Sequence, residues 1–387
     1  MILKYKYRLY PTKSQAEKLF NFCGANRYIW NHFLAEEIKQ YQIDQKFRFY
    51  HNNSQDLTAL KKTLTWLKDV PSTSLQQTLR NLDIALKQSF KRGNAKKGFP
   101  KFKKKKYFDQ SFSLAMINAT NFKSKNRFLM PKIGQMKVAM HRNLPSDFAS
   151  GQVKLEGNRW FLVLTCDSPV VSLPKTEKSI GIDLNSKEYV LSNGTRHIIP
   201  KFLKENQFQI KGLQRKLAKC KNGSTNRRKI QLKLYKVHQR VTNKRLNYFH
   251  TLSKNLVTAY DRISLESLDV AGIQGKMGKV VQDNGFSMFR SMIVYKAELY
   301  GKETVLIDRW YPSSQLCSQC RSLHKIELSC RTYECSNCKL IIDRDLNAAI
   351  NINGAGTAQS APGDDQVGQM ITFGILSGVS DGGSHVL

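Results

Sequence analysis

The sequence has few acidic residues for its size. Only 29 Asp and Glu stand against 63 Lys and Arg, which gives a formal net charge of +34 over 387 residues. Solubility does not require such an imbalance, whereas a polyanionic partner would explain it. Hydrophobic residues make up an ordinary 41% of the chain, and this length predicts roughly two or three domains. The composition therefore indicates a folded protein that binds nucleic acid.

Long apolar runs and a secretory leader are also missing. Because no run of about 18 apolar residues occurs, the sequence predicts no membrane-spanning helix. The first residues, MILKYKYRLYPTKSQ, lack the apolar core and cleavage site of a signal peptide. A membrane surface is disfavoured as partner, since the basic residues are spread along the chain rather than gathered beside one apolar face. We expect a cytoplasmic protein.

Cysteine is sparse except in one segment. Scattered cysteines suit a reducing compartment better than a disulfide framework, and these are Cys23, Cys166 and Cys220. Two Cys-x-x-Cys pairs separated by fourteen residues place four thiolates around one tetrahedral ion. The paired residues are Cys317, Cys320, Cys335 and Cys338. The sequence therefore predicts one structural Zn²⁺ per chain.

Three carboxylates stand at the ends of apolar segments. Asp183 interrupts a predicted strand, Glu266 ends another, and Asp345 begins a short helix predicted over Leu346–Ile352. Each one alone is more often a turn former, helix cap or ion-pair partner than a metal ligand. Burying all three together without cations would be costly. Phosphodiester hydrolysis needs such a cluster, with two Mg²⁺ about 4 Å apart and oxygen ligands.

Two basic regions are expected to contact nucleic acid. Between Lys91 and Lys106, nine of sixteen residues are Lys or Arg and aromatic residues are interleaved, which is typical of contacts with phosphates and bases. Most charge runs are solvated surfaces, but Pro100 and the aromatic residues favour an ordered loop. Residues 203–245, predicted as one or two helices, carry fourteen Lys or Arg and one acid, Glu205, so an anionic partner would stabilise them. The candidate contacts are Lys91, Arg92, Lys96, Lys97, Phe99, Lys101, Phe102, Lys103, Lys104, Lys105, Lys106, Arg215, Arg227 and Arg228.

Periodicity predicts a mixed α/β protein. Residues 2–10 alternate like a half-buried strand, and Thr12 with Gln15 forms the capping box of a helix. Helical patterning extends to about residue 91, after which short strands follow over 111–170, with a hairpin at Glu156-Gly157-Asn158. With the first strand these could close a small barrel.

The second half predicts strands around Asp183 and Glu266, separated by helices. A further helix is predicted over 247–260, apart from the one or two over 203–245. Residues 272–284 are rich in glycine and polar residues and predict a mobile loop. The residues after Gly354 are mostly Gly, Ser and Asp, which indicates a disordered tail.

Three motifs in order carry a family resemblance. GIDLN, ISLESL and DRDLNAAINI, with the paired cysteines just before the third, resemble the split RuvC-like nuclease of the TnpB (OrfB) proteins of insertion sequences, which are related to type V CRISPR effectors. The N-terminal KYRLYPTKSQ is also similar to that family. The resemblance implies an RNA-guided DNA endonuclease with an RNase H-like domain. It places the catalytic, Mg²⁺-binding acids at Asp183, Glu266 and Asp345 and leaves the part of Asp343 open.

The same resemblance implies partners and a domain layout. The partners are a noncoding guide RNA and a double-stranded target DNA beside a short flanking motif, bound by a monomer in the prokaryotic, nucleoid-associated cytoplasm. A wedge-type β-barrel domain (1–11 plus 109–174) and a helical recognition domain (12–108) precede a RuvC-like domain (179–312 plus 339–353). An inserted zinc ribbon (313–338) and a disordered tail (354–387) complete the layout.

Two positions depart from the family pattern, and two other functions compete with this one. Asn185 stands where the family usually has Gly and is expected not to touch the metals, while Arg321 replaces the usual Gly after the first cysteine pair. Cys330 is an additional thiol. The competing functions are a DNA-binding transposase that acts without RNA and a non-catalytic guided regulator. Cleavage by RNA-free protein would indicate the first, and indifference to a change at Asp183 would indicate the second.

Overall fold

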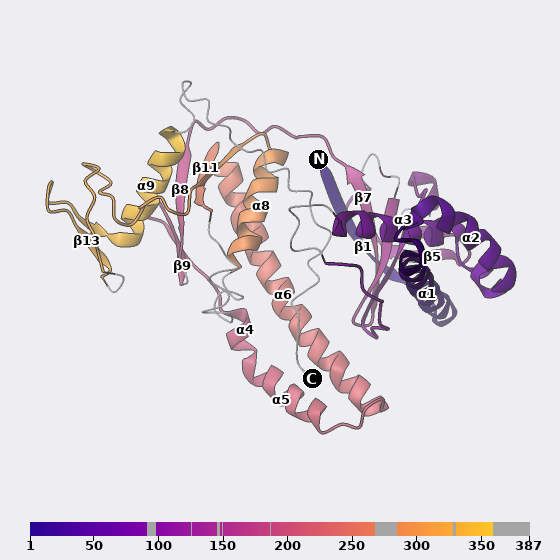
Figure 1. Cartoon of the computed structure of the whole chain (residues 1–387). Helices are drawn as coiled ribbons and strands as arrows, with labels where there is room; N and C mark the ends of the chain where they lie inside the picture. Colours follow the sequence, from indigo (N-terminus) through magenta and orange to yellow (C-terminus); the bar gives the residue numbers. More distant parts are fainter. Residues whose placement is uncertain are drawn as a thin grey trace. The chain divides into compact units, whose positions relative to one another are not determined.

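The chain divides into two compact units, each described by itself (Figure 1). The computed structural model describes residues 1–90, 98–124, 126–144, 148, 150–185, 187–267, 285–327 and 330–358. The first unit is Met1–Ser168 and the second begins at Pro169. Within the described ranges, no helix is long and apolar enough to cross a membrane.

The first unit contains a seven-stranded sheet in the order β2-β6-β7-β1-β5-β4-β3, in which all neighbours are antiparallel. The predicted alternation of the first strand is confirmed, because Tyr7 and Leu9 are buried while Lys4 is exposed. The predicted hairpin at Glu156 is confirmed too, with Glu156 opposite Arg159. Closure of these strands into a barrel stays a prediction. The strands are β1 (Ile2–Tyr10), β2 (Asp109–Ala115), β3 (Phe122–Ser124), β4 (Arg127–Met130), β5 (Gly134–Ala139), β6 (Ser150–Glu156) and β7 (Arg159–Asp167).

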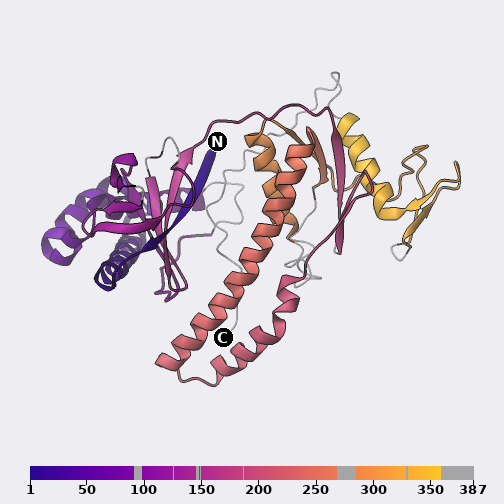
Figure 2. The ribbon, with the colours of Figure 1, turned by 180° about the vertical axis from the view of Figure 1, so that it is seen from behind.

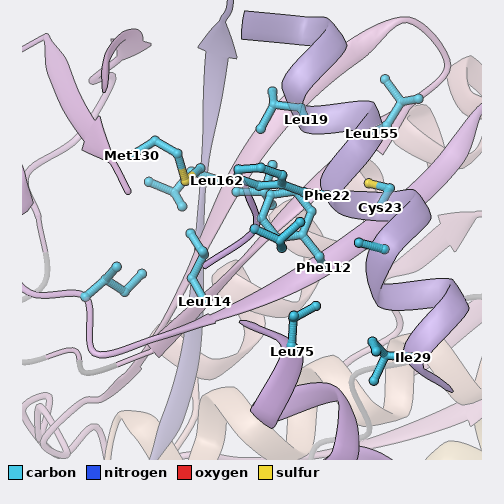
Figure 3. Packing of buried hydrophobic residues seen from close by; sticks show 14 of the residues in the cluster. Leu19, Phe22, Cys23, Ile29, Leu75, Phe112, Leu114, Met130, Leu155 and Leu162 are labelled. Atoms are coloured by element: carbon cyan, nitrogen blue, oxygen red, sulfur yellow. The ribbon is translucent and has the colours of Figure 1, made fainter. Parts of the chain in front are cut away.

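Helices and sheet of the first unit share one hydrophobic core (Figure 3). Leu19 and Phe22 of the first helix pack with Phe112 and Leu162 of the sheet. The predicted capping box of Thr12 is confirmed by both of its hydrogen bonds, at 3.0 and 3.3 Å. Because the core is continuous, the boundary between a recognition domain and a barrel domain stays a prediction. The helices are α1 (Lys13–Asp44), α2 (Phe49–Thr63), η1 (Thr65–Asp69), α3 (Ser72–Ser89) and η2 (Ala119–Asn121).

The second unit contains a five-stranded mixed sheet in the order β10-β9-β8-β11-β12. The pairs β8–β11 and β11–β12 are parallel, and the other two pairs are antiparallel. Helices cover both faces: α9 lies on one, and α6 with α8 on the other (Figures 1 and 2). The strands are β8 (Ser179–Leu184), β9 (Glu188–Leu191), β10 (Arg196–Ile198), β11 (Arg262–Glu266) and β12 (Glu303–Ile307). A separate ribbon pairs β13 (Thr332–Glu334) with β14 (Ile341–Asp343).

The helices of the second unit correct two predictions. The predicted break near residue 246 is wrong, since α6 runs without interruption over Thr225–Ala259. The predicted end of the last helix near Ile352 is also wrong, because α9 spans Arg344–Ala358 and so takes the first residues of the predicted tail. The remaining helices are α4 (Phe202–Glu205), α5 (Gln207–Ala218) and α8 (Phe286–Leu299). The loop predicted over 272–284 and the tail beyond residue 358 lie outside the described residues.

A helical arm projects from the sheet of the second unit (Figure 2). It consists of α5 and the first half of α6, which run back along each other. Ser224 caps α6 by accepting from the backbone N–H of Arg227 at 3.1 Å. The Arg227 guanidinium donates to the carbonyls of Leu217 and Cys220 at 2.9 and 3.1 Å. These bonds satisfy the carbonyl end of α5 and fix the turn of the arm.

Candidate active site and zinc ribbon

Asp183 and Glu266 lie side by side at one edge of the mixed sheet. Strands β8 and β11 are parallel, and Ile182 pairs with Leu265, so the next residue of each strand is one of the two acids. Side chains alternate between the faces of a strand, and Ile182 and Leu265 belong to the core against α6 and α8. The two carboxylates therefore point to the opposite face, where α9 lies.

Helix α9 brings Asp345 to the same face, and Gly181 makes this close approach possible. A Cβ at Gly181 would lie 2.2 Å from the Ala349 carbonyl oxygen and 2.5 Å from the Asn353 nitrogen. Any side chain there would push the helix off the strand. Because Gly181 precedes Asp183 by two residues, it lies on the same strand face. Gly181 thus allows close packing of α9, the helix whose first turn contains Asp345.

The pKa of Asp183 responds to both of the other acids. Burial first, and then the charges of Glu266 and Asp345, raise the pKa of Asp183 to about 8. Burial also raises the pKa of Glu266, while a hydrogen bond from Ser313 Oγ to its Oε1 at 2.5 Å acts in the opposite direction. Two ionised carboxylates in one buried site repel each other, so a cation would favour their ionised forms.

Asp343 has a different role from Asp345. Its Oδ1 accepts from the backbone N–H groups of Asp345 and Leu346, both at 3.0 Å, which is how an N-cap satisfies the first turn of a helix. The same oxygen pairs with Arg196 Nη2 at 2.8 Å. The sequence left open that an aspartate at this position is a helix cap. Asp343 is that N-cap.

Three residues that were not predicted as site residues contact the acids. Asn185 Nδ2 donates to Asp345 Oδ2 at 2.6 Å, so Asn185 contacts a proposed metal ligand, and the expectation that it does not touch the metals stays a prediction. Arg331, which directly precedes β13 of the ribbon, places Nη1 3.6 Å from the same oxygen, and Ser313 holds Glu266. The position of Asn185, two residues after Asp183 in the first motif, is the signal that could have indicated its contact with Asp345. Arg331 and Ser313 carry no such signal in the sequence.

The four predicted zinc ligands come together. The Sγ atoms of Cys317, Cys320, Cys335 and Cys338 all lie within 4.8 Å of one another. Among the described residues, this is the one group of three or more possible ligands whose arrangement could hold a metal ion. Four thiolates suit tetrahedral Zn²⁺ and leave no open coordination position. Asp183, Glu266 and Asp345 do not form such a group within the described residues.

The ribbon's two tight turns are closed by non-glycine residues. Arg321 and Lys339, each directly after a cysteine pair, have φ of +61° and +60°, a region in which side chains other than glycine are strained. The Arg321 guanidinium donates to Asn351 Oδ1 of α9 at 3.2 Å. This bond ties the ribbon to the helix that carries Asp345, a contact that a glycine at position 321 could not make.

The described part of the basic segment 91–106 is fixed to α1. Trp30 Nε1 donates to the Lys101 carbonyl at 3.1 Å, and the Asn31 side chain bonds both the N–H and the carbonyl of Lys103, at 2.7 and 3.0 Å. Phe99 and Phe102 keep 40% and 52% of their surface exposed, enough to offer a ring to a base. Lys104, Lys105 and Lys106 are exposed. The predicted contacts Lys91, Arg92, Lys96 and Lys97 lie outside the described residues.

Lys103 differs from the three lysines that follow it. Its Nζ lies 3.5 Å from the centre of the Trp30 ring. Although much of the residue is exposed, this packing buries the ammonium group and lowers its pKa to about 8. Lys103 therefore fixes the segment to the helix rather than extending into solvent.

Three family models match successive parts of the chain. A "Helix-turn-helix domain" model covers residues 1–46, a "Probable transposase" model (OrfB of IS605) covers 163–277, and a "Cas12f1-like, TNB domain" model covers 286–352. The last of these spans the ribbon and Asp345.

Similarity over most of the chain extends to named proteins and to a solved structure. A protein of Streptomyces pristinaespiralis, named "Putative RNA-guided DNA endonuclease", is 33% identical over 371 residues, which is 93% of this chain and 90% of that protein. InsQ of Escherichia coli K12, with the same description, is 26% identical over 93% of this chain and 94% of its own. The protein in the cryo-EM structure of a Cas12f1–sgRNA–target DNA complex shares the fold, with a TM-score of 0.54 at 13% identity over 91% of this chain and 98% of that one.

Proposed function

This chain belongs to the TnpB (OrfB) family, and we propose that it is an RNA-guided DNA endonuclease of a transposable element. In this proposal it binds a noncoding guide RNA as a monomer and cleaves double-stranded DNA beside a short flanking motif. The second unit would contain an RNase H-like (RuvC) domain with the zinc ribbon inserted between β12 and α9. The first unit would supply the wedge-type and recognition parts.

The observation that carries the proposal is the convergence of three acids from three separate elements. Asp183 lies near the end of β8, Glu266 ends β11 and Asp345 lies in the first turn of α9. Burial and then the charges of the other two raise the pKa of Asp183. Buried acids held against their own repulsion fit a divalent cation site better than a structural role. Asp183, Glu266 and Asp345 would hold two Mg²⁺.

The chemistry is the hydrolysis of a phosphodiester. When bound, the Mg²⁺ pair activates a water and stabilises the leaving oxygen. The protein keeps Glu266 oriented through Ser313 and Asp345 oriented through Asn185. Arg331 supplies a positive charge next to Asp345 that can also meet a phosphate oxygen. The four cysteines would hold a structural Zn²⁺, because all four thiolates are used and no site is left for a substrate.

The charge distribution supports an RNA partner. The net charge of +34 needs a polyanion to balance it, and the helical arm adds basic residues along both of its helices. Arg215 and Arg228 are the proposed contacts on the arm. Arg227 is a contact only in addition to its structural bonds with the end of α5.

The test is to purify the protein from cells that carry its element and to sequence the RNA that copurifies. Target plasmids with randomised flanking bases are then cleaved with the complex in Mg²⁺, with Asp183→Ala as the matched inactive control. We expect one RNA class and cleavage that depends on both the RNA and Mg²⁺. Cleavage by RNA-free protein would favour a transposase instead, and wild-type behaviour of Asp183→Ala would exclude this nuclease site.

A further inference from the structure

A turn beside the acids exposes a tryptophan. Strand β12 is parallel to β11, and Ile307 pairs with Glu266, so the residues after β12 leave the sheet at the edge where the acids lie. The chain has four tryptophans. Trp310, in this turn, is 78% exposed, whereas Trp30, Trp66 and Trp160 are 8%, 44% and 4% exposed.

The backbone of this turn is fixed at both ends. Asp308 Oδ1 accepts from the Trp310 N–H at 2.7 Å, and the Asp308 carbonyl accepts from Tyr311 at 3.1 Å. At the other end, Ser313 is 6% exposed and donates to Glu266. The Ser313 carbonyl accepts from Asn351 of α9 at 2.9 Å. The exposed indole thus belongs to the turn whose Ser313 hydrogen-bonds the proposed metal ligand Glu266.

Single exposed apolar residues are common and need no explanation by themselves. The second observation is Arg309, whose guanidinium carbon lies 4.7 Å from the centre of the Trp310 ring. A flat aromatic face next to a cation is the combination that binds single-stranded nucleic acid, because the ring stacks on a base and the cation meets a phosphate.

We propose that Trp310 is a stacking platform for one unpaired base of the DNA strand that is being cut. The inference rests on the proposed nuclease function of the same site. Trp310 lies three residues from Ser313, which contacts Glu266, and three residues of chain span at most about 10 Å. The stacked base therefore lies a few nucleotides from the scissile phosphate.

The proposed platform distinguishes unpaired from paired DNA and does not distinguish one base from another. Every base has a face that can stack, so Trp310 accepts any base once it is unpaired. A base inside a duplex is already stacked on its neighbours and offers no such face. The proposed substrate at the acids is therefore single-stranded DNA, and the choice of sequence is left to the guide.

The experiment measures binding in a cleavage-deficient background. The RNA complex of Asp183→Ala is titrated with fluorescein-labelled single-stranded DNA that matches the cut region, in Ca²⁺. Trp310→Ala is expected to weaken binding about tenfold, as the loss of one aromatic–base stack does. Trp310→Phe, which keeps a ring, should bind nearly as wild type, whereas Trp310→Leu, which keeps only an apolar side chain, should resemble Trp310→Ala.

Abasic sites then locate the stacked base. One abasic nucleotide is moved along the strand and combined with Trp310→Ala in a double-mutant cycle. At one position near the cut, the two losses should not add, because both remove the same stack. Additive losses at every position, or wild-type binding by Trp310→Leu, would overturn the proposal.

The outcomes separate the platform from the nuclease proposal. If Trp310→Ala lowers the melting temperature of the DNA-free complex and leaves DNA binding unchanged, the indole packs against protein and the platform is excluded. If the parent protein never cleaves but the abasic cycle still couples to Trp310, the platform stands and the nuclease assignment fails.

Discussion

The Asn185 side-chain amide donates to Oδ2 of Asp345 at 2.6 Å, although 160 residues separate the two along the chain. Asn185 belongs to the end of β8 and Asp345 to the first turn of α9, so this bond orients one acid from the strand that carries another. The family usually has glycine at position 185, which cannot make the bond. This protein therefore fixes Asp345 by a contact of its own.

Replacing Asn185 tests that contact. Asn185→Gly should lower the cleavage rate by roughly 10- to 100-fold, the range found when an oriented ligand loses its supporting hydrogen bond. The expected signature is a higher Mg²⁺ requirement, measured by titrating Mg²⁺ in single-turnover cleavage. Asn193→Gly, in the turn after β9, is the matched control. Unchanged Mg²⁺ dependence in Asn185→Gly would contradict the assigned role.

Replacing the three acids tests the metal site. Asp183→Ala, Glu266→Ala and Asp345→Ala should each abolish cleavage and leave target binding nearly intact, and double variants should lose no more, because the acids act as a unit. Cleavage and binding are measured on the same RNA complexes. Asp343→Ala should keep cleavage and lose about 1 kcal/mol of stability through its cap. If Asp343 proves essential and Asp345 does not, the ligand at this helix is misassigned by two residues.

Replacing a cysteine tests the ribbon. Cys317→Ser should lower the melting temperature of the second unit and remove zinc, since the ribbon core is small and depends on metal. Metal analysis of the purified parent should find about one zinc per chain. Cys330→Ser, which changes an exposed cysteine outside the cluster, should retain zinc and stability. Active native protein without zinc would show that the cluster is not a zinc site.

Salt dependence tests which lysines meet phosphates. Replacing Lys104, Lys105 and Lys106 with Ala should reduce the slope of log affinity for guide RNA against log salt by about one unit for each phosphate that is no longer neutralised. Lys103→Ala should leave the slope unchanged, because its ammonium group is packed on Trp30. Phe102→Ala should weaken binding without a change in slope, since stacking releases no counterions. A parental slope in the triple variant would identify the segment as solvated surface.

The buried Lys296 predicts a pH dependence of stability. Its Nζ donates to the His250 carbonyl at 2.6 Å and to Ser253 Oγ at 2.7 Å, and burial followed by the charge of Lys254 lowers its pKa to about 8. The unfolded chain therefore binds more protons than the folded one between about pH 8 and the ordinary lysine pKa near 10.4. The parent should gain stability relative to Lys296→Met as pH rises through that window, measured as melting temperatures at pH 7.5 and 10. The exposed Lys229→Met should track the parent at both pH values.

The local sequence pattern was enough to predict the strands that contain Asp183 and Glu266 and to identify these two acids. An apolar strand that is interrupted by or ends in one carboxylate predicts Asp183 and Glu266, and both lie at the same sheet edge. The contacts of Asn185, Ser313 and Arg331 join distant segments. Sequence spacing does not determine which of these segments meet, because strand register and ribbon placement are set by tertiary packing.

Helix limits were the weaker predictions, for two physical reasons. The first half of α6 has only two buried residues, Val237 and Val241, whereas the second half has five and packs on α8, so the change of pattern near residue 246 resembles a break. Gly354 and Gly356 suggest the end of α9, yet a Cβ at Gly356 would meet Ser264 Oγ at 1.9 Å. That glycine allows the helix to lie directly on β11 rather than ending it.

Helix α9 packs against Gly181 of β8, but the ribosome synthesises the helix long after the strand. The ribosome must add the 160 residues from Asn185 to Asp345 before the third acid exists, which takes roughly 8 to 30 s at ordinary elongation rates. The basic segment and the arm emerge before the end of that interval. Under the proposed function, the regions expected to bind RNA are therefore synthesised before the proposed cutting site is complete.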